Sequence, residues 1–135
     1  MIVLDEQLLG RSLETAIAHW YQGAVRFITD LRPHTVIKDD AIPRLLQQER
    51  QPTFVTINES DFWRKVGINN HFCVVCFALP DSQAHEISPR LRSLLRQSTF
   101  STKKQRMGKV VRVTNRQISY YTFDDRQIRV INLED

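Results

Sequence analysis

The stretch Phe72-Cys73-Val74-Val75-Cys76-Phe77-Ala78-Leu79 contains no charged or strongly polar residue and is rich in β-branched and aromatic side chains. This composition favours a buried β-strand, which we predict over residues 72–79. Successive side chains of a strand point to opposite faces, so Cys73 and Cys76, three residues apart, should face away from each other. The sequence therefore predicts two small core residues here, and neither a disulfide nor a shared metal.

Strand and helix patterns alternate on the N-terminal side of this stretch. The strand patterns, which end in polar residues or turns, lie at residues 2–5, 25–29 and 54–58. Helical spacing of apolar residues predicts a helix over 7–21 that ends at Gly23. A second helix should begin at Asp39 or Asp40, carry Pro43 in its first turn and end near Glu49. A short helical turn over 59–63 should be capped by Ser60.

The C-terminal side begins with one more helix and then changes character. Ser88 and Pro89 predict the helix start, and its buried stripe consists of Ile87, Leu91, Leu94 and Leu95. Beyond it, β-rich runs at 110–113, 118–123 and 127–131 are separated by turn residues, which predicts an antiparallel meander. Alternation through the first 97 residues implies right-handed crossovers and a mainly parallel sheet. We therefore predict one three-layer α/β domain over 1–135, with the meander extending or flanking its sheet.

The bulk composition is that of an ordinary globular domain. The chain has 135 residues, of which 41% are hydrophobic and 25% charged, enough for a hydrophobic core without disulfides or a structural metal. No uncharged apolar run approaches the roughly 18 residues that a membrane helix needs. The N-terminus does not resemble a secretory signal. We expect a cytoplasmic protein that does not span a membrane.

Positive charge is concentrated in one segment of the chain. The formal net charge is +4, and the segment from Arg90 to Arg116 contains nine Lys or Arg residues and no Asp or Glu. Such a segment can form a solvated basic surface or a groove for a polyanion, because clustered cations attract phosphate backbones. The composition leaves both interpretations open.

Acidic residues follow the predicted strands, at the edge where parallel sheets bind ligands. Asp5 and Glu6 end the first strand, Asp39 and Asp40 open a helix, and Asn58 with Asp61 follows the strand at 54–58. Clustered carboxylates repel one another unless a cation neutralises them, and hard oxygen ligands select Mg²⁺ or Mn²⁺. A divalent-metal site is one explanation. The others are a helix cap for Asp39 or Asp40, a helix N-terminus for Glu6 and a strand-end turn for Asp5.

Other catalytic motifs are absent from the sequence. The four histidines, His19, His34, His71 and His85, show no HExxH or HxH spacing, which gives a zinc site little support. The four glycines are isolated, so neither a GxxxxGKT nor a GxGxxG phosphate loop is present. There is also no GxSxG nucleophile elbow.

In its first 80 or so residues the chain resembles the PIN-like family of small nuclease domains, which includes toxins of toxin–antitoxin pairs. Leu4-Asp5-Glu6 is similar to the family's opening motif, Asp39-Asp40-Ala41-Ile42 to its central acidic helix start, and Phe54-Val55-Thr56-Ile57-Asn58 with Asp61-Phe62 to its Thr-x-Asp...Asp-Phe segment. The resemblance implies an endoribonuclease that depends on Mg²⁺ or Mn²⁺. It also implies RNA as substrate and a cognate antitoxin as partner.

The same resemblance implies roles for individual residues. Asp5 would be the principal metal ligand, Asp40 or its neighbour Asp39 the second and Asp61 the third, while Thr56 would orient the water. Glu6 and Asn58 belong to the candidate metal set as well. Arg92, Arg96, Lys103, Lys104 and Arg106 would form a basic rim that holds RNA near the acidic pocket, or part of a surface for an acidic antitoxin.

Asn58 departs from the family pattern, because the family usually has an aspartate there and an amide brings no charge to a cation. Either Asp61 compensates, or the domain has lost catalysis and binds RNA or a protein partner. A phosphoacceptor domain using Asp5 is a third alternative, although its acceptor would be expected on the middle strand, where this chain has Asn58. A homodimer also remains an open alternative.

Overall fold

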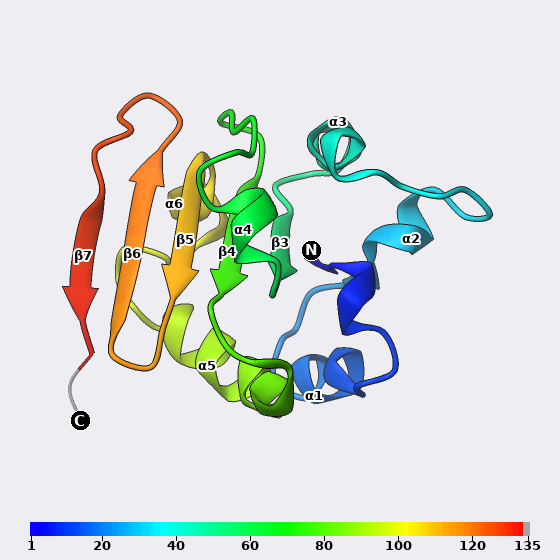
Figure 1. Ribbon diagram of the computed structural model, residues 1–135, viewed down its shortest axis with the longest axis horizontal. Coiled ribbons are helices and arrows are strands. Elements are labelled where there is room, and N and C mark those ends of the chain that lie inside the picture. Colours follow the sequence, from blue (N-terminus) through cyan, green and yellow to red (C-terminus); the bar gives the residue numbers. More distant parts are fainter. Residues whose placement is uncertain (134–135) are drawn as a thin grey trace.

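Seven strands form one mixed sheet in the computed structural model, which describes residues 1–133 (Figure 1). The first five strands are parallel to one another, and the last two continue the same sheet in antiparallel fashion. The strand order is β2-β1-β3-β4-β5-β6-β7. The bounds are β1 (Ile2–Leu4), β2 (Val25–Phe27), β3 (Thr53–Thr56), β4 (Cys73–Phe77), β5 (Lys109–Val113), β6 (Gln117–Thr122) and β7 (Arg129–Asn132). The predicted parallel sheet and its antiparallel meander are thus confirmed.

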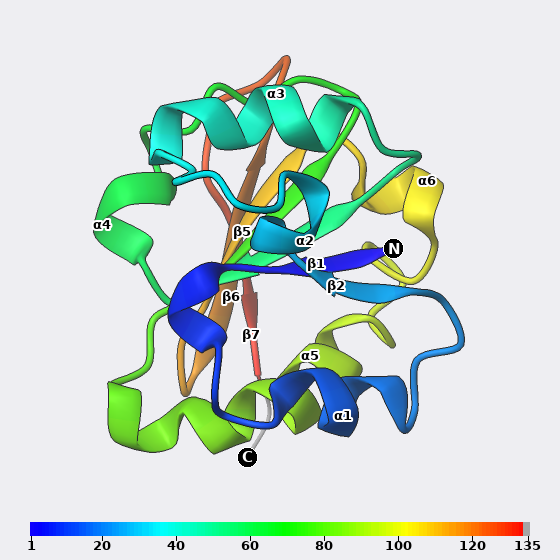
Figure 2. The same ribbon diagram turned by 90° about the vertical axis from the view of Figure 1, so that its right-hand side faces the viewer.

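Helices cover the sheet on both faces and produce three layers, as predicted. In Figure 2, α1 and α5 lie below the sheet, and α2 and α3 lie above it. The α-helices are α1 (Leu13–Ala18), α2 (Ile28–Leu31), α3 (Ile42–Gln47), α4 (Glu59–Phe62), α5 (Ile87–Leu94) and α6 (Lys103–Arg106). Three 3-10 turns, η1 (Glu6–Leu8), η2 (Asp39–Ala41) and η3 (Asp81–Glu86), complete the described elements.

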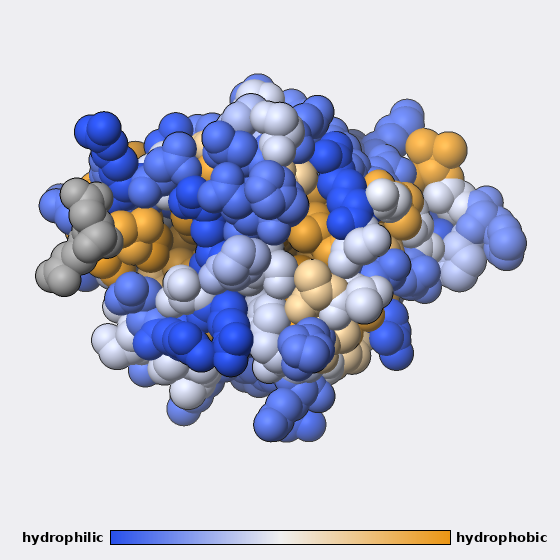
Figure 3. Space-filling view, turned by 90° about the horizontal axis from the view of Figure 1, so that it is seen from below, coloured by the Kyte–Doolittle hydropathy of each residue, from blue (hydrophilic) through white to orange (hydrophobic). Residues whose placement is uncertain are grey.

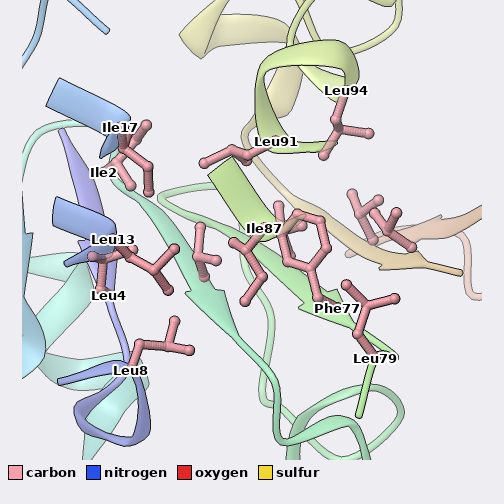
Figure 4. Packing of buried hydrophobic residues seen from close by; sticks show 14 of the residues in the cluster. Ile2, Leu4, Leu8, Leu13, Ile17, Phe77, Leu79, Ile87, Leu91 and Leu94 are labelled. Atoms are coloured by element: carbon pink, nitrogen blue, oxygen red, sulfur yellow. The ribbon is translucent and has the colours of Figure 1, made fainter. Parts of the chain in front are cut away.

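Two hydrophobic clusters hold the layers together, one on each face of the sheet. In the first, side chains of α1 and α5 such as Ile17 and Leu91 pack on strand residues such as Ile2 and Phe77 (Figure 4). The second joins helices α3 and α4 to the opposite face, with Val3, Phe54, Val74, Leu46 and Phe62 among its members. Because alternate residues of the central strands β1, β3 and β4 enter different clusters, both faces of the sheet are buried at its centre, as expected for strands covered by helices on both sides.

The two cysteines occupy opposite clusters, as their spacing predicts. Cys73 belongs to the first cluster and Cys76 to the second, and both are free and fully buried. Burial raises the pKa of the Cys73 thiol to about 12 and that of Cys76 further still. Since the thiolate is the reactive form, both act as packing residues.

The predicted helix over 7–21 is wrong in its first half. Gly10 and Ser12 both have positive φ angles, 77° and 57°, which an α-helix does not accommodate. The chain therefore forms the short turn η1, breaks, and begins α1 only at Leu13. Leu9, one of the apolar residues whose helical spacing suggested this helix, is 50% exposed.

Three boundaries are set by short polar contacts that the apolar pattern does not reveal. The predicted strand over 25–29 stops at Phe27, because a carboxylate oxygen of Asp30 accepts the Phe27 N–H at 2.9 Å and starts α2. Helix α4 is capped by Asn58 and not by Ser60. Thr102 caps the unpredicted helix α6.

The face that carries α1 and α5 is mainly hydrophilic, with an apolar area on the side of β7 (Figure 3). There a hollow of about 730 Å³ lies between α5 and the last strands, and its apolar lining includes Leu94, Ile118 and Ile131. Within residues 1–133, no helix is long and apolar enough to cross a membrane.

Candidate functional site

The strand order places a topological switch point next to Asp5. From β1 the chain moves to β2 on one side, and β3, β4 and β5 then add on the other side. In sheets of this 2-1-3-4-5 order the switch point lies between β1 and β3, and ligands bind there beyond the carboxyl ends of the strands. Asp5 directly follows β1, and Thr56 is the last residue of β3. Both residues therefore lie where the topology favours a ligand.

Asp5 is buried and held rigidly at this point. Asp5 is only 3% exposed, and its carboxylate Oδ2 accepts a hydrogen bond from the Thr56 hydroxyl at 2.6 Å. Its backbone N–H donates to the carbonyl of Val55 at 2.9 Å. The Thr56 Oγ1 also accepts the Asn58 N–H at 2.9 Å. Thr56 thus directs its proton at Asp5 and positions that carboxylate.

Burial of the Asp5 carboxyl raises its pKa above the ordinary value of 3.8, and the nearby charge of Glu6 adds to the effect. Hydrogen bonds from Thr56 and from the backbone N–H groups of Glu6 and Gln7 oppose the shift without cancelling it. A buried carboxylate is costly unless it is paired. Since Asp5 has no cationic partner within residues 1–133, its ionised form carries an unpaired buried charge.

Asp39, on η2, lies within the electrostatic influence of Asp5 and of Asp61. The pKa of Asp39 is raised first by partial desolvation, then by the charge of Asp5 and by the hydrogen bond and charge of Asp61, with Glu6 contributing last. Like charges shift a pKa in this direction only when they lie near one another. We call Asp5, Glu6, Asp39 and Asp61 the acidic cluster. Asp39, on η2, is thus influenced by the charges of the other three members of the cluster.

A cavity of about 490 Å³ opens beside this cluster. Asp39, Asp40 and Asp61 line it together with Lys65. Neither Asp39 nor Asp40 caps a helix, because Lys38 and Ala41 occupy the capping positions of η2 and α3. Lys65 was missed in the sequence, although it lies four residues after Asp61, the spacing that places two side chains on one helical face.

Asn58 has a structural explanation. Its Nδ2 donates to Oδ2 of Asp61 at 2.5 Å, and its Oδ1 accepts the Asp61 N–H at 3.3 Å. An aspartate at position 58 would instead place a second negative charge against Asp61. The amide therefore caps α4 and holds Asp61 beside the cavity.

The acidic cluster and Asn58 fit a hard cation in chemistry and only partly in geometry. Their side chains offer carboxylate or amide oxygens, the ligands preferred by Mg²⁺ and Mn²⁺. In the part of the chain that the structure describes, however, no three Asp, Glu, His or Cys side chains converge closely enough to hold a metal. Asp39 and Asp61 are exposed and stand on short helical turns. Closure around a cation therefore requires rotation of these two side chains toward Asp5.

The predicted basic rim around the acidic pocket is wrong in its placement. Arg106 donates from Nε to the Thr53 hydroxyl at 3.0 Å, and Thr53 begins β3, whereas Asp5 and Thr56 lie at the opposite ends of their strands. In Figure 2, helix α6 lies on the side where β1 begins, and α4 lies on the other side. Arg92, Arg96 and Lys103 line one hollow with Arg106, and Lys104 lines a neighbouring one. The basic residues thus occupy the amino edge of the sheet.

Arg106 is also unavailable as an exposed RNA ligand. It is only 4% exposed, and its Nη1 donates to the carbonyl of Phe100 at 2.9 Å in addition to the Thr53 contact. Its guanidinium ties the loop before α6 to the start of β3.

We expect Arg106→Met to lower the free energy of unfolding by about 2 kcal/mol, because the change leaves the buried Thr53 hydroxyl and Phe100 carbonyl without their hydrogen-bond donor. Urea unfolding of both proteins measures this loss. The exposed neighbour substitution Lys104→Met is the control and should change stability by less than about 0.5 kcal/mol. Equal stabilities for the Arg106 variant and the unmodified protein would contradict the structural role.

No protein-family model, curated protein or solved structure matches this chain in the comparisons.

Proposed function

We propose that this protein is a PIN-like endoribonuclease that hydrolyses RNA phosphodiesters with Mg²⁺ or Mn²⁺. The observation that carries the proposal is the buried carboxylate of Asp5 at the switch point, whose charge, together with that of Asp61, raises the pKa of Asp39. Repulsion of this kind costs folding free energy, and a divalent cation relieves it. Asp5, Asp39 and Asp61 are the proposed ligands.

The surrounding residues have distinct tasks in this proposal. Magnesium, when bound, supplies positive charge for the phosphodiester and for activation of water. Thr56 fixes Asp5 through its hydroxyl, and Asn58 holds Asp61. Lys65, which lines the same cavity, provides a cation for a phosphate oxygen. Glu6 and Asp40 add negative charge without being assigned a ligand bond.

Cleavage of RNA in vitro tests this function. Purified protein should cut a labelled single-stranded RNA internally in the presence of Mg²⁺ or Mn²⁺ and should stop when EDTA removes the cation. The protein with Glu14→Gln, an exposed acid on α1 outside the cluster, should cut as fast as the unmodified protein. Metal-independent cleavage, or the absence of cleavage with either metal, would contradict the proposal.

The toxin role is the finer part of the proposal. In this role the protein acts in the cytoplasm, and an antitoxin binds it and blocks its ribonuclease activity. A homodimer of the toxin is an additional part of the proposal. Expression of the protein alone should arrest growth, and co-expression of an adjacent gene for a small DNA-binding protein should restore it. Normal growth during expression of active nuclease would separate the enzyme from the toxin role.

A second candidate is a binding module without catalysis. It is favoured by the observation that no three metal-ligating side chains converge within residues 1–133. This candidate predicts RNA or protein binding that is indifferent to divalent cations. The phosphoacceptor alternative gains no support, because β3 ends at Thr56 and the next polar side chain, Asn58, is an amide engaged with Asp61.

The pH dependence of stability offers a test that requires no substrate. Folding raises the pKa of Asp5 above 3.8, so the folded state binds its proton more tightly than the unfolded state does. The stabilisation by this proton is complete below pH 3.8 and is lost as the pH rises through the raised pKa. Without metal at neutral pH, the free energy of unfolding of Asp5→Asn should therefore exceed that of the unmodified protein by about 1 kcal/mol. The variant should accordingly unfold at a higher temperature.

The difference between the two proteins should shrink as the pH falls toward the ordinary aspartate value, because protonated Asp5 and asparagine are both neutral. Thermal unfolding in metal-free buffers across this range measures it. A constant difference at all pH values would show that Asp5 titrates normally. Glu14→Gln serves again as the control, and it should show no pH-dependent change.

A further inference from the structure

The nine cations between Arg90 and Arg116 divide into two groups in the folded chain. Four have partners within the protein: Arg90 pairs with Glu86 at 2.9 Å, Arg112 pairs with Glu59, Lys109 donates to the Thr99 carbonyl at 3.1 Å, and Arg106 is buried. For the other five, no carboxylate within residues 1–133 forms an ion pair; these are Arg92, Arg96, Lys103, Lys104 and Arg116. The unpaired group is therefore the one available to a ligand.

Three of the unpaired cations converge on one groove at the amino edge of the sheet. Arg92 lies in the last turn of α5, Arg96 in the turn that follows it, and Lys103 at the start of α6. They line a hollow of about 420 Å³ together with Arg106. No Asp or Glu contributes to this lining. A concave surface that carries only positive charge concentrates anions.

The groove also carries aromatic side chains. Trp20 and Tyr21, which follow α1, also line it and contact each other edge to face, with ring centroids 6.0 Å apart. The indole N–H of Trp20 is already used, because it donates to the Ser88 hydroxyl at 2.9 Å. The hydrogen bond fixes the indole in place, and both rings are partly exposed. Apolar ring surface beside cations is the combination that binds single-stranded nucleic acid through bases and phosphates.

We propose that this groove, formed by Trp20, Tyr21, Arg92, Arg96 and Lys103, binds single-stranded nucleic acid. The cations contact successive phosphates, and the aromatic wall receives a base. The groove lies at the edge of the sheet opposite the acidic cluster, so this binding surface is separate from the proposed cleavage site. Its existence does not depend on catalysis.

The alternative explanation for the two arginines is helix stabilisation, because cations near the C-terminus of α5 interact favourably with its dipole. That role explains neither the aromatic wall nor Lys103, which belongs to a different helix. It also predicts a loss of stability and no loss of nucleic-acid binding, so the two explanations separate experimentally.

Fluorescence anisotropy with labelled oligouridine of about 12 nucleotides tests the proposal, since single-strand sites span about 4–16 nucleotides. All measurements use EDTA and the Asp5→Asn background, so that cleavage plays no part. The triple variant Arg92→Gln, Arg96→Gln, Lys103→Gln should bind at least tenfold more weakly. Its log–log salt slope should fall by about 2, because each lost phosphate contact contributes about 0.7.

The matched control is Arg26→Gln, Arg44→Gln, Arg116→Gln, three exposed cations outside the groove. Both triple variants reduce the formal net charge from +4 to +1, so general electrostatic attraction falls equally. Equal weakening in both variants would overturn the proposal. So would tighter binding of duplex DNA than of the single strand, or binding of poly-glutamate in the groove without any binding of oligouridine.

Tryptophan fluorescence provides a readout that does not rely on the triple variant. The chain has two tryptophans, and Trp63 packs against Tyr121 away from the groove, with ring centroids 5.2 Å apart. In Trp63→Phe, oligouridine should quench the remaining Trp20 emission. In Trp20→Phe, the emission of Trp63 should not change. The reverse pattern, or no quenching of Trp20 at saturating oligouridine, would contradict base contact in the groove.

Discussion

Replacing Asp5 with asparagine should abolish metal-dependent RNA cleavage, by about a thousandfold or more, while leaving the fold intact. The asparagine has nearly the same shape and can still accept the Thr56 hydroxyl proton, so the 2.6 Å contact at the end of β3 is retained in kind. What it removes is the buried negative charge at the switch point, which in the proposed function holds the cation. Initial rates of RNA cleavage in Mn²⁺ measure the loss, and unfolding curves confirm that the protein is folded.

The same substitution has a cellular consequence. Expression of the Asp5→Asn variant should no longer arrest growth, whereas the Glu14→Gln control should remain as toxic as the unmodified protein. Equal toxicity of the Asp5 variant would contradict the catalytic explanation of toxicity, because this variant keeps the protein and RNA binding of its other surfaces.

Asp39→Asn and Asp40→Asn should have very different effects although the two residues are adjacent and both exposed. The carboxyl of Asp39 is coupled to Asp5 and Asp61, so loss of its charge should weaken Mn²⁺ binding by about tenfold or more, the cost of roughly 1.4 kcal/mol. Asp40 lines the cavity without an assigned ligand bond, and its replacement should change the affinity by less than about threefold.

The comparison of these two variants is internally controlled, because each removes one negative charge from the same 3-10 turn. Manganese titrations of both proteins, at one pH and ionic strength, give the two affinities. A larger loss for the Asp40 variant would reassign the second ligand to Asp40, and equal losses would indicate a general field effect.

The layer architecture was predictable because it depends on long apolar patterns. The run from Phe72 to Leu79 contains the central strand β4, and the alternation of strands and helices through the first 97 residues predicts the mainly parallel sheet. The boundaries were not predictable from the same signal. Gly10 and Ser12 break the first helix by backbone conformation, and Asp30 begins α2 by accepting a single N–H. Such local polar contacts compete with hydrophobic periodicity and do not appear in it.

The candidate site was predictable in the same uneven way. Carboxylates at strand ends could be placed at one edge from the topology alone, and the charges of Asp5 and Asp61 do influence Asp39. The position of the basic segment could not be inferred, because it depends on how α5 and α6 pack against the sheet. Arg106 illustrates the reason: a basic residue in a basic run proved to be a buried tie to Thr53.

Titration calorimetry of Mn²⁺ into the metal-free protein and its Asp5→Asn variant decides whether Asp5 anchors a metal centre. The unmodified protein should bind one or two ions at submillimolar affinity, more strongly as the pH rises and the carboxyl groups with raised pKa ionise. The Asp5→Asn variant should show no such binding. Absence of binding to the unmodified protein at millimolar Mn²⁺, or equal binding by both proteins, would contradict a metal centre built on Asp5.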